Sequence, residues 1–387
     1  MSYFKGYKIR LYPTKEQERM FWMHIGCCRY VWNHMLEVQI NNYKNCGKFI
    51  GAFSMCNVLT RLKQDGEHGW LYEVSNASLQ NECKDLEAAL KMMRKAKNGF
   101  PKFKSKKSDK KSFPVSSDKN ALYFSEKHIK IPKVGKVKYK TDFSLPFGTN
   151  RETICNPRIS FNGSKWFLSF AMECENQVHQ LTDKPMGVDL GTRKLAIVAF
   201  GSDEKIFYNI NKTSEMKKLE AKKRHYQRVQ ARKYEAFKKR TGRYGKTNNI
   251  IRTEDKIRKI DAKLSNIRHN YIHQITHELI SQLPRRVTME DLNIQQLMKN
   301  KHQAKDIQKA CWYEFIRQMK YKCEWNGIEF CQVDRYYPSS KTCSCCGYID
   351  RNLGSKETYV CPECGLVIDR DINAAINLMT YYDRYAA

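Results

Sequence analysis

Acidic residues are scarce in this sequence. It has 40 Asp and Glu against 70 Lys and Arg over 387 residues, so the formal net charge with neutral histidines is +30. A folded monomer with this charge repels itself unless an anionic partner neutralises it. That favours a nucleic acid as the partner and leaves an acidic membrane surface as the competing one. Hydrophobic residues make up 41% of the chain, which is too many for a disordered polycation.

Long apolar runs and phosphate-binding loops are also missing. No stretch approaches the ~18 apolar residues that span a bilayer. The first residues, MSYFKGYKIRLYP, alternate charge with aromatic rings and lack the apolar core of a signal peptide. We therefore expect neither secretion nor membrane insertion, and we expect a cytoplasmic location. The chain also has no glycine-rich phosphate loop, which argues against a nucleoside triphosphatase.

The 15 cysteines are not spread evenly, as they would be in a small disulfide-bonded domain. Ten of them occur singly or as the Cys27-Cys28 pair, and the other five lie within residues 343–364. An odd total and the lack of an export signal fit a reducing compartment. We expect the scattered ten to be small core or surface residues without a function of their own.

Two cysteine pairs in residues 343–364 have the spacing of a metal site. Cys343-x-x-Cys346 and Cys361-x-x-Cys364 are separated by fourteen residues, and each is followed by a glycine, where a tight turn needs positive φ. Together they present four thiolates in the tetrahedral set that zinc prefers. Such a zinc would be structural, because no coordination position stays open. Cys345 could replace Cys346, although it lacks the matching spacing, and unligated or redox-active cysteines are the other alternative.

The first half of the chain predicts a sheet interrupted by helices. Residues 3–11 alternate as a strand does, and Thr14 with Gln17 forms a capping-box start for helices that continue to about residue 97. Short alternating runs then fill residues 112–175, which predicts a small all-β unit. If the strand at 3–11 completes it as a barrel, the helices are an insertion in that barrel.

A lysine-rich segment, KFKSKKSDKK at residues 102–111, separates the helices from the strands. A solvated basic loop is one interpretation, since charge runs usually are solvated. The other is nucleic-acid contact, because Phe100 and Phe103 are interleaved with the lysines, as in segments that combine phosphate contacts with base stacking. The residues of this segment leave both interpretations open.

The second half predicts a mixed α/β region. Residues 186–200 read as a hairpin of buried strands, residues 286–290 and 328–334 as further strands, and residues 213–241, 253–283 and 305–326 as helices. From Lys217 to Lys246 there are thirteen basic and two acidic residues. Like charges at i,i+4 destabilise an isolated helix, so we expect an anionic partner along this segment.

Three acidic residues of the α/β region lie where a charge is costly. Asp189 interrupts an apolar strand, Glu290 ends the next one, and Asp371 lies where an alanine-rich helix begins. Three carboxylates that converge would bind two divalent ions ~3.5–4 Å apart, as in phosphodiester hydrolysis, and oxygen ligands select Mg²⁺ or Mn²⁺ over zinc. A helix cap or a salt bridge is the alternative for each acid alone, and for Asp369 and Asp371 this alternative is an N-cap.

These residues carry a family resemblance. GVDLGTRKLAIV, MEDLNI, SSKTCSCCG and CPECG followed by DRDINAAINL resemble the RuvC-type nuclease and zinc ribbon of transposon-encoded TnpB proteins, which resemble the ancestors of type V CRISPR effectors. YKIRLYPTKEQE and FPKFKSKK resemble the N-terminal and mid-chain segments of the same family. By position, Asp189, Glu290 and Asp371 match the family's metal-binding triad. Asp371 is preferred over Asp369 because the family's acid precedes x-Asn-Ala-Ala.

The resemblance implies an α/β RNase H-like (RuvC) nuclease domain with a zinc ribbon insertion, and an N-terminal wedge β-barrel that carries an inserted helical recognition domain. The implied boundaries are 1–13 for the first wedge strand, 14–99 for the recognition domain, 100–182 for the rest of the wedge, 183–335 for the nuclease with a basic hairpin at 213–283, 336–367 for the ribbon, and 368–387 for the last nuclease helix.

The resemblance also implies a function. The chain would be an RNA-guided DNA endonuclease of a transposon that cleaves guide-matched double-stranded DNA beside a short adjacent motif, in a prokaryotic, nucleoid-associated setting. Its cofactors would be two Mg²⁺ (or Mn²⁺), one structural Zn²⁺ and a guide RNA from the transposon end, bound by a monomer. A nuclease-inactive or CRISPR-associated RNA-guided DNA-binding protein of the same ancestry is the alternative. The expected nucleic-acid contacts are Lys102, Phe103, Lys104, Lys106, Lys107, Lys222, Arg224, Arg228 and Arg232.

Overall fold

The computed structural model divides into two compact units, Met1–Glu175 and Asn176–Ala387. It describes residues 2–95, 99–106, 111–116, 122–141, 154–175, 179–354 and 356–385. Lys107, one of the expected nucleic-acid contacts, lies outside these described residues.

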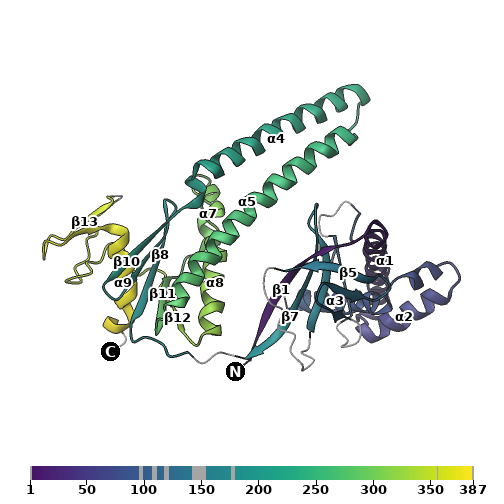
Figure 1. Ribbon diagram of the computed structural model, residues 1–387, viewed down its shortest axis with the longest axis horizontal. Helices are drawn as coiled ribbons and strands as arrows, with labels where there is room; N and C mark the ends of the chain where they lie inside the picture. Colours follow the sequence, from purple (N-terminus) through teal and green to yellow (C-terminus); the bar gives the residue numbers. More distant parts are fainter. Residues whose placement is uncertain are drawn as a thin grey trace. The chain divides into compact units, whose positions relative to one another are not determined.

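The first unit is built on an antiparallel sheet with the strand order β2-β6-β7-β1-β5-β4-β3. The strand expected at residues 3–11 is β1 (Ser2–Tyr12), which pairs with β7 along most of its length and with β5 at its end (Figure 1). The other strands are β2 (Lys111–Pro114), β3 (Tyr123–Phe124), β4 (His128–Ile131), β5 (Gly135–Lys140), β6 (Ile154–Phe161) and β7 (Trp166–Glu175). Among the described residues, β2 and β3 are the edges of the sheet and no pairing closes it.

Three helices lie between β1 and β2 in the sequence: α1 (Lys15–Cys46), α2 (Ala52–Gln64) and α3 (Asn76–Arg94). The capping box predicted from Thr14 and Gln17 starts α1, and Gly47, with a φ of 67°, ends it. The helices share one core with the sheet. In that core the Phe21 ring of α1 lies 4.9 Å from the Trp166 ring of β7, so α1 is held against the strands by aromatic packing.

The second unit contains a five-stranded sheet in the order β10-β9-β8-β11-β12. The hairpin expected at residues 186–200 is β8 (Pro185–Leu190) and β9 (Lys194–Phe200), and the expected strands that follow are β11 (Arg286–Glu290) and β12 (Glu329–Val333). β8 pairs antiparallel with β9 but parallel with β11, which in turn pairs parallel with β12. The sheet is therefore mixed, and β8 joins its antiparallel part to its parallel part.

Helices cover both faces of this sheet. On one face, apolar residues of α5 (Asn248–Ser281) and α8 (Trp312–Trp325) pack against Met186 and Val188 of β8. On the other, α9 (Arg370–Tyr385) packs through Ala375 against Ile197 and Ala199 of β9 (Figure 1). Since side chains alternate along a strand, the residue next to Val188, which is Asp189, faces α9.

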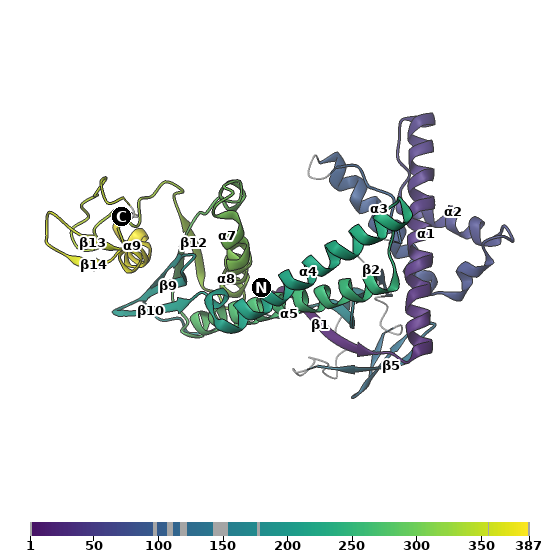
Figure 2. The same cartoon turned by 90° about the horizontal axis from the view of Figure 1, so that it is seen from above.

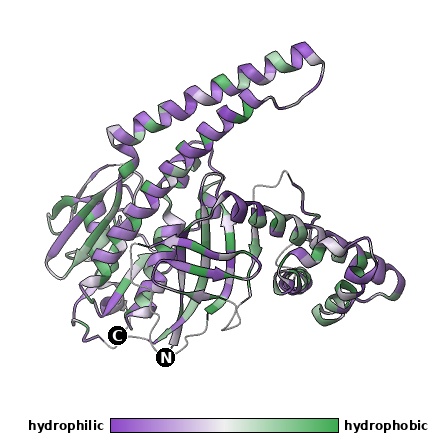
Figure 3. Ribbon diagram, turned by 45° about the vertical axis from the view of Figure 1, so that its right-hand side comes forward, coloured by the Kyte–Doolittle hydropathy of each residue, from purple (hydrophilic) through white to green (hydrophobic). Residues whose placement is uncertain are grey.

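The basic segment from Lys217 to Lys246 forms most of the first helix of a long helical hairpin and the turn that follows it. The hairpin comprises α4 (Ser214–Thr241) and the first part of α5, which run antiparallel and extend away from the sheet of this unit (Figure 1, Figure 2). Thr213 and Thr247 cap the two helices, and Gly242, with a φ of 70°, ends α4. Hydrophilic residues dominate α4, whereas the strands carry the hydrophobic ones (Figure 3).

Two features differ from the sequence-based expectations. The helix expected at 305–326 is interrupted at Cys311, whose φ of 55° ends α7 (Ala304–Ala310) and precedes α8. The break lets the mostly buried Trp312 donate from its indole nitrogen to the Gly191 carbonyl at 3.3 Å, a tertiary contact that overrides local helix preference. The second difference is β10 (Asp203–Tyr208), an edge strand that follows a turn at Gly201 and that the sequence did not predict.

Candidate metal centres

The pairing of β8 with β11 brings two of the expected carboxylates together. The parallel register aligns Thr288 with Gly187 and Met289 with Val188. Continued by one residue, this register places Glu290 beside Asp189, on the same face of the sheet. Neither residue's partner can be read from the sequence, because the register depends on how two distant strands meet.

The third carboxylate comes from α9. Gly187 and Asp189 are two residues apart on β8 and so share a face, while Asp371 and Ala375 are one turn apart on α9 and so share a side of that helix. A Cβ at Gly187 would lie 2.1 Å from the Ala375 carbonyl oxygen, which means that the two backbones touch there. The close contact therefore brings the first turn of α9, which carries Asp371, near Asp189.

The electrostatics of Asp189 reflect this convergence. Burial, and after it the negative charges of Glu290 and Asp371, raise the pKa of Asp189 to about 8. Arg370 opposes this shift in part. A carboxyl with so high a pKa beside two other acids is a typical setting for a bound cation, because a divalent ion would remove the repulsion that raises the pKa.

Asp369 and Asp371 have different environments. Asp369 accepts hydrogen bonds from the backbone N–H groups of Asp371 at 2.9 Å and Ile372 at 3.3 Å, and it pairs with Lys194 Nζ at 2.6 Å. Asp369 is therefore the N-cap of α9. Asp371 makes longer ion pairs, of 3.4 Å with Lys194 and 3.5 Å with Arg370, and its carboxylate is not used as a cap.

Glu290 has a neighbour that the sequence did not single out. The buried Ser339 donates from its hydroxyl to Glu290 Oε1 at 2.5 Å. Asn377 of α9 donates to the Ser339 carbonyl at 2.8 Å, so Ser339 is itself held by the helix that carries Asp371. The sequence did contain a sign of this contact. DINAAIN has two asparagines four residues apart in an apolar helix, and asparagines there indicate hydrogen bonds to a neighbouring segment.

The four cysteines expected to bind zinc come together. The sulfur atoms of Cys343, Cys346, Cys361 and Cys364 all lie within 4.8 Å of one another. The Cys343–Cys364 and Cys346–Cys361 sulfurs are 3.6 and 3.5 Å apart. These separations exclude disulfides, whose S–S length is about 2.05 Å. They are close to the S–S edge of about 3.8 Å that a tetrahedron with metal–sulfur bonds of about 2.3 Å has.

The turns around this cysteine cluster have the predicted form. Gly347 and Gly365 have φ values of 81° and 73°, and their N–H groups donate to the carbonyls of Cys343 and Cys361, each at 3.0 Å. Cys345 is exposed and does not belong to the set of four. The two turns therefore give the ligand set that the matching spacing indicates.

The cysteine cluster is joined to α9. Asn373 donates to the Thr342 carbonyl at 2.6 Å and accepts from the Ser344 N–H at 2.9 Å, and it is fully buried. The turn that carries Cys343 is thus fixed to the helix that carries Asp371. Of the described residues, only the cysteines bring three or more such ligand atoms within 4.8 Å, so the carboxylate oxygens are spread more widely than the sulfurs.

The expected nucleic-acid contacts fall into two groups. Lys222, Arg224, Arg228 and Arg232 are all exposed on α4, and no ion pair to another described residue involves them. The segment at 102–106 is instead fastened to α1. Trp32 donates to the Lys102 carbonyl at 3.1 Å, and Asn33 exchanges two hydrogen bonds with the backbone of Lys104. Phe103 is exposed, whereas Lys104 pairs with the buried Glu82 at 2.6 Å.

No helix in the described part of the chain is both long and apolar enough to cross a membrane.

Three family models match parts of the chain. Residues 1–48 match a model described as a helix-turn-helix domain, although the structure has one strand and one long helix there. Residues 169–301 match a probable transposase, and residues 312–378 match the TNB domain of Cas12f1-like proteins. The last match spans the cysteine cluster and the start of α9 together with Asp371.

Whole-chain relatives agree with these models. A "Putative RNA-guided DNA endonuclease" of Streptomyces pristinaespiralis is 27% identical over 376 residues, covering 97% of this chain and 88% of the relative. The "Putative RNA-guided DNA endonuclease InsQ" of Escherichia coli K12 is 27% identical over 398 residues, covering 98% and 92%. A similar fold occurs in a chain of the cryo-EM structure of the Cas12f1–sgRNA–target DNA complex, with a TM-score of 0.61 and 14% identity. The match covers 98% of this chain and 99% of that one, so the two share a fold. These matches confirm the resemblance of the chain to the TnpB family along its whole length.

Proposed function

We propose that this protein is an RNA-guided DNA endonuclease that cleaves guide-matched double-stranded DNA. The observation that carries the proposal is the convergence of Asp189, Glu290 and Asp371 from two adjacent parallel strands and the first turn of α9. The names of the whole-chain relatives support the reaction, and the Cas12f1 fold supports an architecture that holds RNA and DNA together.

The three carboxylates would hold two Mg²⁺ or Mn²⁺ ions, since oxygen ligands favour these ions over zinc. The ions would supply Lewis-acid stabilisation of phosphate charge and a bound water of lowered pKa. The contribution of the chain itself is rigidity. The β8–β11 register fixes Asp189 and Glu290, the contact between Gly187 and Ala375 fixes the helix of Asp371, and Ser339 orients Glu290.

The sulfurs of the cysteine cluster would hold one structural Zn²⁺, because all four tetrahedral positions are taken by protein ligands. The zinc would stiffen a turn that Asn373 ties to α9. In this assignment the second unit is a RuvC-like nuclease interrupted by a zinc ribbon at 336–367. The first unit is a wedge domain with its helical recognition domain inserted after β1.

The guide RNA and its hybrid with DNA would be gripped by charge and shape, and base pairing would supply sequence specificity. Four exposed cations of α4 support this assignment, since they form no ion pair with another described residue: Lys222, Arg224, Arg228 and Arg232. The net charge of +30 is then balanced by phosphates of the RNA rather than by the protein's own acids.

The test is cleavage by the protein purified with its native flanking transcript. A guide-matched duplex should be cut when Mg²⁺ is present and left intact without it. Glu290→Gln, Asp189→Asn and Asp371→Asn should each lower the cleavage rate by at least about a hundredfold, because each removes one charge from a metal-binding set. Guide-dependent binding of the duplex should be unchanged.

Asp369→Ala is the matched control for Asp371→Asn. It removes a helix cap and costs about 0.5–2 kcal/mol of stability, so it should lower the melting temperature while cleavage well below that temperature stays within a fewfold of the parent. If Glu290→Gln cuts as fast as the parent, the assignment is wrong. Tight guide-dependent binding without any cleavage would identify the chain as a nuclease-inactive DNA-binding protein instead.

A further inference from the structure

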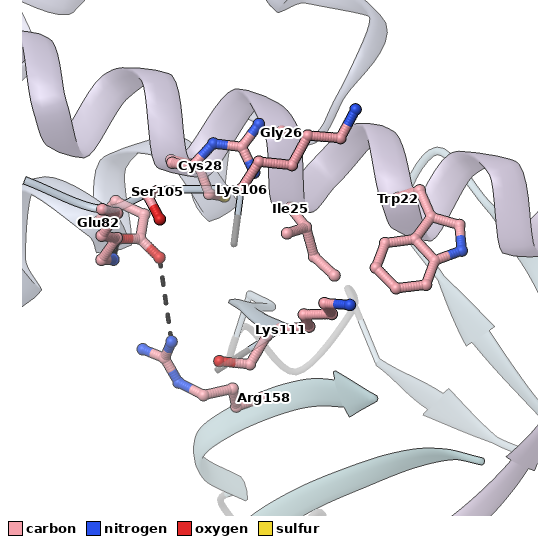
Figure 4. A pocket seen from close by; sticks show the side chains of 12 residues that line it. Trp22, Ile25, Gly26, Cys28, Glu82, Ser105, Lys106, Lys111 and Arg158 are labelled. Atoms are coloured by element: carbon pink, nitrogen blue, oxygen red, sulfur yellow. Dashed lines mark hydrogen bonds and ion pairs between the residues drawn. The ribbon is translucent and has the colours of Figure 1, made fainter. Parts of the chain in front are cut away.

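The first unit contains a cavity of about 610 Å³ that the proposed endonuclease mechanism does not use. Its walls come from α1, α3, the segment at 104–106, β2 and β6, all within one unit (Figure 4). A volume of this size is in the range of pockets that bind small organic ligands. Three features of its lining indicate what that ligand is.

The first feature is a buried acid at the pocket. Glu82 of α3 is only 1% exposed. Its Oε2 atom pairs with Lys104 Nζ at 2.6 Å, but Oε1 receives no hydrogen bond from any described residue. The second cation paired with Glu82, Arg158, has its Nη1 atom 3.9 Å from Oε1, which is too far for a hydrogen bond (Figure 4). A buried carboxylate oxygen without a donor is unfavourable, so a ligand that carries an N–H or O–H group is expected there.

The second feature is an excess of positive charge. The lining holds five cations, namely Arg29, Lys104, Lys106, Lys111 and Arg158, against the single acid Glu82. Lys104 and Arg158 are already engaged by acids, Arg158 also through Asp85. Arg29, Lys106 and Lys111 form no ion pair with another described residue. Cations that the protein leaves uncompensated around a cavity favour an anionic ligand.

The third feature is an open apolar wall on α1. Trp22 is 37% exposed and Lys111 Nζ lies 5.4 Å from its ring centroid; Ile25 and Gly26 lie one turn further along the helix. Gly26 is in the middle of a helix, where glycine is unfavourable. Its backbone does not need glycine, and a Cβ there would meet nothing within 4 Å. Packing within the protein therefore does not account for this glycine, whereas room for a ligand does.

We propose that this pocket binds one nucleotide, with its phosphate beside Arg29, Lys106 and Lys111 and its base against Trp22 and Ile25, where an N–H or amino group of the base donates to Glu82 Oε1. Phosphate, flat ring and hydrogen-bond donor occur together in a nucleotide, and the lining offers a partner for each. The nucleotide comes either from a nucleic-acid strand, as a base turned out of the stack, or from solution as a monophosphate. The proposal goes beyond the proposed cleavage reaction and does not depend on it.

The test measures binding to the full-length protein without guide RNA or Mg²⁺, so its outcome is independent of cleavage. Saturation-transfer NMR and calorimetry are run with 5′-GMP, 5′-dGMP, 5′-CMP and the trinucleotides r(AGA) and d(AGA), with inorganic phosphate for comparison. Tighter binding of the trinucleotides than of the monophosphates indicates a strand as the source, and the ribose and deoxyribose forms separate RNA from DNA. Tighter binding of the monophosphates indicates a free nucleotide.

Two substitutions locate the site. Gly26→Leu keeps a helix-compatible residue but fills the pocket, and should weaken nucleotide binding at least tenfold while the melting temperature is kept. Glu82→Gln should weaken nucleotides about tenfold, through the loss of a charged hydrogen bond, and leave the affinity for inorganic phosphate unchanged. The matched controls are Gly69→Leu, also a glycine with open space around it, and Glu87→Gln on the same helix as Glu82.

The expected result is loss in the two pocket variants and parent-like affinity in the two controls. Equal nucleotide affinity in the parent and Gly26→Leu would overturn the proposal, and so would a parent that binds inorganic phosphate as tightly as any nucleotide. If Glu82→Gln does not fold, its ion pairs are a structural necessity and Gly26→Leu alone decides.

Discussion

Gly187 of β8 lies directly against the backbone of α9, since a Cβ at Gly187 would be 2.1 Å from the Ala375 carbonyl oxygen and 2.4 Å from the Met379 nitrogen. Both of those atoms belong to a helix backbone, which cannot rotate away as a side chain can. The contact therefore sets the distance between the strand that carries Asp189 and the helix that carries Asp371.

Gly187→Ala should consequently damage the carboxylate centre without touching a carboxylate. The methyl group has to displace α9, at a cost of about 1–3 kcal/mol or more, and guide-dependent cleavage should fall at least tenfold. The control is Gly6→Ala in β1, where a Cβ would meet nothing within 4 Å; it should leave melting temperature and cleavage unchanged. Parent-like cleavage in a folded Gly187→Ala variant would contradict the role of this contact.

The pKa of Asp189 predicts a pH dependence. Burial first, then Glu290 and Asp371, raise it to about 8 in the folded protein, against about 3.9 for a free Asp. The folded state therefore binds a proton that the unfolded state has released. Without a divalent ion, this contribution to stability is complete below about pH 4 and is lost as pH rises through about 8.

This dependence is measured as the difference in melting temperature between parent and Asp189→Asn in Mg²⁺-free buffer from pH 6 to 9. The amide does not titrate, so the parent should lose stability relative to the variant as pH rises. Added Mg²⁺ should reverse the trend, since it binds the deprotonated carboxylate, and its stabilisation of the parent should grow up to about pH 8. A difference that does not change with pH would show that Asp189 is ionised throughout this range.

The cysteine cluster predicts a clear contrast between two adjacent residues. Cys346→Ser removes one of four sulfurs that lie within 4.8 Å of one another, so the protein should retain well under one zinc ion per chain and melt at a lower temperature. Cys345→Ser removes an exposed sulfur outside the set and should keep one zinc ion per chain. Elemental analysis of the purified variants gives both numbers. The opposite pattern would mean that Cys345 is the ligand.

How much of this could be predicted from the sequence depends on the range of each interaction. The zinc ligands follow from CxxC spacing, and the capping box from two residues three apart, because both are local. The sequence placed Asp189 within one strand and Glu290 at the end of another, as the structure has them. Their adjacency depends on a register between strands about a hundred residues apart. Gly187 carried no signal at all, because the helix that needs its missing side chain lies near the other end of the chain.

The pocket around Glu82 was missed for a related reason. A glutamate in an amphipathic helix is ordinary in a sequence, and only the packing of α3 against β6 shows that this one is buried beside Arg158. The break at Cys311 was missed because its cause is the contact of Trp312 with Gly191, two residues that are distant in the chain. In each case tertiary contacts decide what local preference leaves open.

The helical hairpin allows the last prediction, which concerns RNA. Arg224, Arg228 and Arg232 follow one another at i,i+4 on the exposed side of α4. Replacing all three by Gln relieves like-charge repulsion, worth roughly 0.2–0.5 kcal/mol per pair, so the fold should be as stable as the parent or slightly more so. Affinity for the guide RNA should nevertheless fall. The slope of log K against log salt should become shallower by about 2, because each lost phosphate contact contributes about 0.7.

The matched control replaces three cations of the same hairpin that already have acidic partners. Lys223 pairs with Asp261, Arg258 with Asp255, and Lys263 with Glu215. Their replacement by Gln changes the net charge by the same amount, so a purely long-range effect of charge would weaken RNA binding equally in both triple variants. Contact between RNA and the arginine row of α4 instead predicts a shallower salt slope in the first variant only, because only those arginines neutralise phosphates and so release counterions from the RNA.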